Sequence, residues 1–175
     1  MKNLIKIFVF VSTLLIILNQ ISYAQPGINR ANEKYFWFNF GMGKGSVGTH
    51  AFALEANASY QFGKNLITLR SAGTAELFGK SIGDYGLLYG IILKQQPTFV
   101  SFGVGLAFVG GSISQGLFST KEPEKIGPTI GLPLEVQLFF RPARFLGIGL
   151  YGFANLNPEE SFVGATISLQ LGKLI

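Results

Sequence analysis

Apolar and polar side chains alternate along residues 51–62. The even positions are apolar, from Phe52 to Phe62, and the odd positions carry the polar side chains. These polar side chains are Glu55, Asn57, Ser59 and Gln61. Successive side chains of a β-strand point to opposite faces, whereas a helix would spread both sets around its circumference. The stretch therefore predicts a strand with one apolar and one polar face.

The same two-faced pattern recurs along the chain and predicts eight strands. The other seven are residues 35–42, 66–77, 85–93, 100–108, 132–140, 146–154 and 163–171. Connections after the second, fourth and sixth strands are short, and the others are longer, with Gly110–Gly127 the longest. An outer-membrane barrel has an even number of strands, short periplasmic turns and longer outer loops. The pattern favours that architecture.

The first short connection also makes a prediction about register. A shift of one residue would turn every side chain of a strand to the other face. The polar faces of residues 51–62 and 66–77 match if Lys64-Asn65 is a two-residue loop that pairs Phe62 with Ile67 and Ser59 with Arg70. A four-residue loop in the same register would serve equally well.

Composition indicates which face meets lipid. Only 13% of residues are charged, beside 48% hydrophobic residues and 23 glycines, whereas soluble domains carry about 25% charge. The polar faces hold mainly small uncharged residues, while a soluble lipocalin-like periplasmic carrier would expose Lys, Glu and Asp. We therefore predict an all-β fold, an eight-stranded antiparallel up-and-down transmembrane β-barrel, because lipid requires every backbone polar group to be paired internally. Aromatic residues near the strand ends are predicted to form interface girdles: Tyr35, Trp37, Tyr60, Phe62, Tyr85, Phe99, Phe139 and Phe162.

The first 24 residues have the pattern of a secretory signal peptide. Lys2 and Lys6 precede an apolar run at residues 7–18, and Ser22-Tyr23-Ala24 supplies a cleavage site before Gln25. We expect residues 1–24 to be removed, residues 25–34 to be a short periplasmic leader, and residues 35–175 to form the barrel. The predicted location is the bacterial outer membrane.

Two segments carry a resemblance to known proteins. Residues 84–90 (DYGLLYG) and 167–172 (ISLQLG) are similar to segments of outer-membrane β-barrel domain proteins of the Bacteroidota type, and the whole chain resembles the OmpA/OmpX-like class of small barrels. The resemblance implies the fold and the location, and it carries no catalytic residues over. It also implies that the last strand serves the barrel-assembly machinery as a signal during insertion. Leu174-Ile175 stands where such proteins usually end in an aromatic residue.

Four charged residues are predicted to face the lumen as a structural network: Glu55, Arg70, Glu76 and Glu135. A buried unpaired charge is expensive, so we expect Arg70 to pair with Glu55 or Glu135. The alternative for paired carboxyl groups is a glycosidase or protease site. An eight-stranded barrel leaves little room for substrate, because side chains fill its interior. We favour the structural network.

Two other features suggest chemistry that the sequence does not support further. Gly43–Gly48 matches GxGxxG, but a dinucleotide site needs a helix behind the glycines, and here a strand is predicted. His50, the only histidine, would serve an outer-membrane lipid-modifying hydrolase of the Ser-His type. In the lipid A deacylases that this architecture resembles, a Ser follows two residues after the His, and here that residue is Phe52.

The expected function is therefore that of a non-enzymatic outer-membrane protein with a structural or interaction role. No cofactor or metal is expected; the chain lacks Cys, so no disulfide or thiolate site can form. Its basic residues form no run that would track nucleic acid. The expected partner is outer-membrane lipid. The loop at residues 112–128 either binds an extracellular or envelope protein or is a solvated, mobile connection, and the sequence leaves both open. A lipid-modifying hydrolase and a soluble carrier remain as alternatives.

Overall fold

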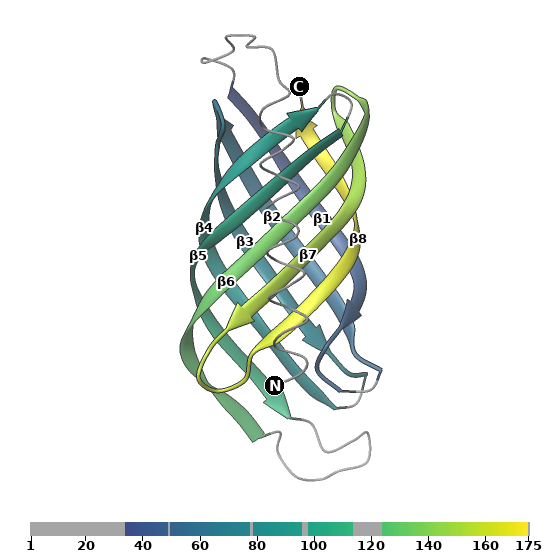
Figure 1. The fold of residues 1–175 in the computed structure, drawn as a ribbon. Coiled ribbons are helices and arrows are strands. Elements are labelled where there is room, and N and C mark those ends of the chain that lie inside the picture. The colour runs from purple at the N-terminus through teal and green to yellow at the C-terminus, as the bar shows by residue number, and fades with distance from the viewer. Residues whose placement is uncertain (1–33, 49, 78, 96–97, 114–123, 175) are drawn as a thin grey trace, which may run out of the picture. The chain divides into compact units, whose positions relative to one another are not determined.

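Eight antiparallel strands form a closed β-barrel in the computed structural model (Figure 1). The structure describes residues 34–48, 50–77, 79–95, 98–113 and 124–174. The predicted signal peptide and the leader up to residue 33 lie outside this part. The strands are β1 (Lys34–Gly45), β2 (Phe52–Phe62), β3 (Asn65–Ala75), β4 (Lys80–Gln95), β5 (Thr98–Ile113), β6 (Glu124–Ala143), β7 (Leu146–Leu156) and β8 (Phe162–Lys173).

Each strand pairs with its sequence neighbours, and β1 closes the barrel by pairing with β8. The predicted fold class is confirmed. In the described part of the chain, no helix has the length and apolar character needed to cross a membrane.

The predicted division of faces is also confirmed. In β2 the odd positions are buried in the barrel, while Phe52, Leu54 and Tyr60 point outward. The inward parity changes to even positions in β3, as the matching of polar faces requires. Polar residues from all eight strands thus share one interior.

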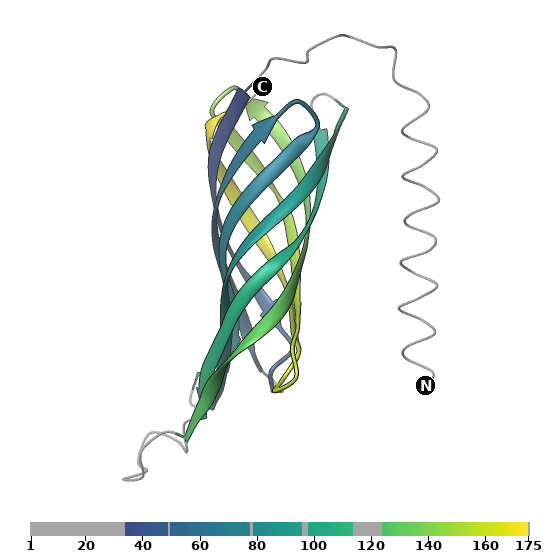
Figure 2. The same ribbon diagram turned by 90° about the vertical axis from the view of Figure 1, so that its left-hand side faces the viewer.

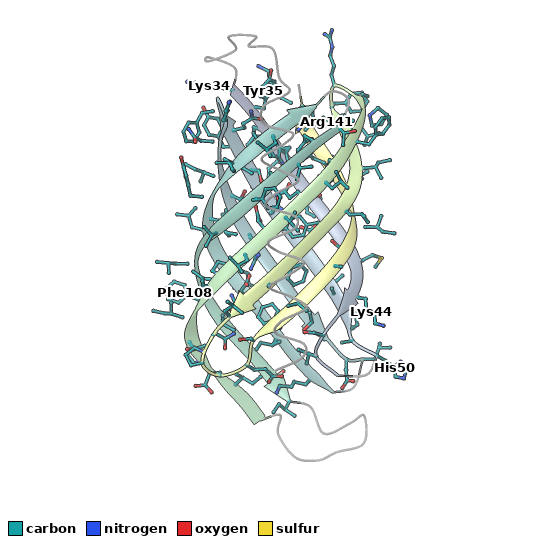
Figure 3. The ribbon with its side chains drawn as sticks, in the orientation of Figure 1. Lys34, Tyr35, Lys44, His50, Phe108 and Arg141 are labelled. Atoms are coloured by element: carbon teal, nitrogen blue, oxygen red, sulfur yellow. The ribbon has the colours of Figure 1, made fainter. Side chains whose placement is uncertain are left out.

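The two ends of the barrel differ in their connections. Residues 63–64, 96–97 and 144–145 connect strands at the end where β1 begins, which we call the turn end. The opposite end, the loop end, carries the longer connections 46–51, 76–79, 114–123 and 157–161. Lys34 and Arg141 mark the turn end, and Lys44 and His50 the loop end (Figure 3). The predicted alternation of short and long connections is confirmed.

The register predicted for the β2–β3 hairpin is wrong by two residues. The two-residue turn is Gly63-Lys64, and Phe62 pairs with Asn65 rather than Ile67. Gly63 has a φ of 61°, and a two-residue hairpin of type II′ takes glycine at this first position. The inward and outward faces of both strands are still as predicted, because both turns contain two residues.

Two strand boundaries also differ from the prediction. Residues 80–83, expected in a loop, belong to β4, and both sides of the long connection are strand: β5 runs to Ile113 and β6 starts at Glu124. Backbone pairing with neighbouring strands extends these segments although their sequence lacks strict alternation. Strands β5 and β6 project beyond their neighbours at the loop end (Figure 2).

Candidate functional site

The centre of the lumen holds a buried ion pair between Arg70 of β3 and Asp84 of β4. Arg70 Nε donates to Asp84 Oδ1 at 3.2 Å, and Nη2 donates to Oδ2 at 2.5 Å. Both residues are 1% exposed. The guanidinium also donates to the Leu134 carbonyl at 2.9 Å and to the Ala154 carbonyl at 3.4 Å. Arg70 therefore ties together four strands, β3, β4, β6 and β7.

Asp84 is the partner that sequence reasoning missed. Arg70 was expected to pair with Glu55 or Glu135, and that expectation is wrong about the partner. Asn155 Nδ2 of β7 also donates to Asp84 Oδ2, at 2.7 Å. Asp84 has the same parity as the inward residues Gly86 and Leu88, so extending the alternation of the fourth strand by one step would have placed its carboxylate in the lumen.

Glu55 and Glu135 are buried in the same lumen but are held by neutral donors. Glu55 accepts from Ser168 Oγ at 2.8 Å and from Asn57 Nδ2 at 3.1 Å. Glu55 and Glu135 are each 5% exposed. Glu135 accepts from the Tyr151 hydroxyl at 2.5 Å and from Gln137 Nε2 at 3.1 Å. Uncharged side chains therefore supply the hydrogen-bond donors of both carboxyl groups.

Glu76, the fourth predicted member, lies apart from this group. It follows β3 at the loop end and is half-buried. Its backbone N–H donates to the Lys80 carbonyl at 2.9 Å, and its carboxyl packs beside Gly48 and Gly79. The structure thus places Glu55, Arg70 and Glu135 inside the barrel and Glu76 in a connection.

Glycines make room for the lumen side chains. A Cβ at Gly131 of β6 would lie 2.0 Å from Asn155 Oδ1, and one at Gly41 of β1 would lie 2.2 Å from Ser168 Oγ and 2.6 Å from Glu55 Oε1. Real Cβ atoms do not approach so closely. The polar network is therefore packed against glycine backbone.

Apolar side chains occupy the lumen on both sides of the charged centre. We call the group toward the turn end the turn-end plug: Tyr35, Trp37, Leu66, Ile92, Phe99, Phe139 and Leu174. The loop-end plug comprises Val47, Ala53, Ala72, Ile82, Val109, Tyr151, Phe153 and Phe162. The Arg141 guanidinium carbon lies 3.7 Å from the centre of the Phe99 ring, and the Phe99 and Phe139 rings stack at 5.4 Å. Side chains thus fill both halves of the interior.

These plugs correct the prediction of aromatic girdles. Five of the eight residues assigned to the membrane interfaces point inward: Tyr35, Trp37, Phe99, Phe139 and Phe162. Only Tyr60, Phe62 and Tyr85 face outward. The inward residues follow the parity of their strands, which outweighs the tendency of aromatic residues to gather at interfaces.

The outer face bears an apolar groove of about 990 Å³. It runs across the strands between two rows of outward residues. One row is Phe40, Ala56, Ser71, Tyr85 and Phe108, and the other is Met42, Leu54, Gly73, Gly83 and Gly110.

The two motifs considered for catalysis lie at the loop end. Strand β2, and no helix, follows Gly43–Gly48, so the arrangement of a dinucleotide site is missing from this described segment. His50 is exposed. Ser46, a serine close to it in the sequence, accepts a hydrogen bond at its hydroxyl from the Val163 backbone N–H at 2.9 Å. In the described part of the chain, no three His, Cys, Asp or Glu side chains are grouped to hold a metal ion.

The β5–β6 hairpin contains part of the loop predicted to bind a partner. Residues 112–113 and 124–128 are strand, and residues 114–123 lie outside the described part. Strand β6 pairs with β5 from Glu124 onward, but its pairing with β7 begins only at Leu132. The opposite edge of residues 124–131 is therefore not paired with β7. Nearby, Lys80 and Glu160 form an ion pair between the start of β4 and the β7–β8 connection.

Comparisons with known proteins agree with the architecture. The chain is similar to Neisserial surface protein A (NspA), with a TM-score of 0.61, 10% identity, and coverage of 79% of this chain and 96% of that one. It is also similar to the N-terminal β-barrel domain of Pseudomonas aeruginosa OprF, with a TM-score of 0.59, 8% identity, and coverage of 81% and 98%. At this identity the likeness shows the fold alone. No family model and no curated protein matches the chain.

Proposed function

We propose that the protein is an outer-membrane β-barrel with a structural or interaction role and no catalytic activity. The observation that carries this proposal is the inverted distribution of polarity. Large apolar side chains such as Leu69 (64% exposed) and Leu87 (60% exposed) cover the outside, while the polar and charged side chains are buried inside. Such a surface is stable in lipid and would aggregate in water. The apolar groove on the same face suits acyl chains.

The filled lumen argues against a diffusive pore. Trp37, Phe99 and Phe139 are at most 2% exposed at one end of the lumen, and Phe153 and Phe162 are at most 4% exposed at the other. Eight strands enclose a space that side chains fill. Any contact with other molecules then falls to the outer face and the two ends.

The loop end is the natural place for a protein partner. Outer loops carry recognition on a rigid scaffold, and the β5–β6 hairpin projects there with one edge of residues 124–131 not paired with β7. Such an edge offers backbone donors and acceptors to an extended segment of another chain. The barrel-assembly machinery is the further partner expected during insertion, after export by the signal peptide.

The decisive experiment compares two substitutions on exposed leucines. Leu69 lies outward within β3, and Leu77 (76% exposed) lies past the end of that strand. In lipid, Leu69→Arg should reduce folding stability by about 2–4 kcal/mol, and Leu77→Arg by at most about 1 kcal/mol, because the cost depends on depth. Folding of the full chain into vesicles is followed by heat-modifiable gel migration. Equal tolerance of both variants would favour the soluble carrier.

Orientation is tested with introduced thiols, since the chain has no cysteine. A membrane-impermeant maleimide added to intact cells should label Lys125→Cys at the loop end and leave Lys173→Cys at the turn end unlabelled. This result would support an orientation in which the loop end faces outward, and the reverse labelling would overturn it. The lipid-modifying alternative predicts an altered lipid A mass spectrum in a deletion strain that wild type restores and His50→Ala does not.

A further inference from the structure

Four basic residues lie at the turn end, on strands and turns that neighbour one another. Lys34, Lys64, Arg144 and Lys173 are exposed. Lys34 pairs with Phe62, which precedes the turn that holds Lys64, and Lys173 pairs with Phe36, two residues after Lys34. The Leu174 N–H donates to the Arg144 carbonyl at 2.8 Å. These backbone contacts place the four residues on neighbouring strands and turns of the rim, from β7 through β8, β1 and β2 to β3, and we call them the basic patch.

The patch has no acidic counterpart at its own end among the described residues. Glu55, Asp84 and Glu135 are buried in the lumen. Glu76, Glu124, Glu159 and Glu160 belong to the loop end. Glu33 lies outside the described part. The loop end, by contrast, mixes Lys44, Lys80 and Lys125 with its acids. The charge of the barrel is therefore asymmetric, and the turn-end rim is positive.

The patch borders the apolar outer face. Phe36 (42% exposed), Tyr60 (39% exposed) and Phe145 (65% exposed) point outward from the strands and turns that carry the basic residues. Aromatic residues next to Lys and Arg are typical of the boundary between hydrocarbon and headgroups. A molecule that contacts both surfaces has an anionic head and apolar chains.

We propose that the basic patch binds the phosphate groups of anionic phospholipids, such as phosphatidylglycerol, in the leaflet at the turn end. Lys offers a compact charge and Arg a planar pair of donors, and both suit phosphate oxygens. The acyl chains lie along Phe36 and Phe145. This inference rests on the proposed membrane location and adds a lipid preference confined to one end of the barrel.

The test measures lipid selectivity of the full chain inserted in phosphatidylcholine vesicles. Spin-labelled phosphatidylglycerol and spin-labelled phosphatidylcholine report which lipid the protein holds at its surface. We expect a preference of about fivefold for phosphatidylglycerol at low salt, weakening in about 0.5 M NaCl as screening shortens the reach of the charges. The variant Lys34→Gln/Lys64→Gln/Arg144→Gln/Lys173→Gln should lose the preference.

The matched control removes three basic residues from the loop end. Lys44→Gln/Lys80→Gln/Lys125→Gln should keep the preference. The proposal is overturned if the turn-end variant keeps it, if the loop-end variant loses it, or if inorganic phosphate abolishes it at constant ionic strength. Insertion is checked separately by resistance to alkaline carbonate. A chain that fails to insert refutes the membrane location, whereas insertion without selectivity refutes only the lipid site.

Discussion

Replacing Arg70 with Gln is expected to destabilise the barrel strongly. The change removes the two hydrogen bonds to Asp84, at 3.2 and 2.5 Å, and leaves that carboxylate 1% exposed with the Asn155 amide as its remaining donor. Breaking a buried ion pair by removing one partner costs about 3–5 kcal/mol, because the other charge stays uncompensated. We expect Arg70→Gln to fall in that range.

A double variant tests whether the loss of stability comes from the unpaired charge of Asp84. Arg70→Gln/Asp84→Asn leaves two neutral polar side chains and no unpaired buried charge, so it should be more stable than Arg70→Gln by about 1–3 kcal/mol. Unfolding in urea is followed through Trp37, the only tryptophan, which is fully buried in the turn-end plug.

The control is the ion pair at the loop end. Lys80 and Glu160 are each about a third exposed in their side chains, at 29% and 32%, so Lys80→Gln should cost less than about 1 kcal/mol. A cost of Arg70→Gln no larger than that of Lys80→Gln would show that burial does not strengthen the dependence on this ion pair. Simple addition of the effects of Arg70→Gln and Asp84→Asn would show that the two side chains are not coupled.

Two further predictions concern the packing around this centre. Gly131→Ala should destabilise by about 1–3 kcal/mol, because its Cβ would lie 2.0 Å from Asn155 Oδ1, whereas Gly110→Ala, with nothing within 4 Å, should stay within about 0.5 kcal/mol in the same urea assay. Equal effects would contradict the close packing. Tyr151→Phe removes the 2.5 Å hydrogen bond to Glu135 and should cost about 1–3 kcal/mol. An unchanged unfolding midpoint would show that this bond contributes nothing.

Some features of the lumen could have been predicted from the sequence. Asp84 shares the parity of its inward strand neighbours, and Phe99 and Phe139 share the parity of Ser101 and Gln137. Consistent use of the alternation would have placed Asp84 in the lumen and moved Phe99 and Phe139 from the interface girdles into the barrel. The register of the β2–β3 hairpin was less accessible, because Gly63-Lys64 and Lys64-Asn65 preserve the same faces. The pairing of Phe62 with Asn65 and the positive φ of Gly63 distinguish the two turns.

The sequence by itself determined that eight strands form and, for most of them, which face is polar, because the period of two is a local property of a strand. In residues 51–62 it placed Glu55, Asn57, Ser59 and Gln61 on one side before any partner was known. Which inward side chains meet was decided only by the closed barrel. Arg70 reaches Asp84 on β4, the Leu134 carbonyl on β6 and the Ala154 carbonyl on β7 because closure brings four strands around one point. In the sequence, Leu134 lies 64 positions and Ala154 lies 84 positions after Arg70. No local pattern encodes contacts between residues so far apart.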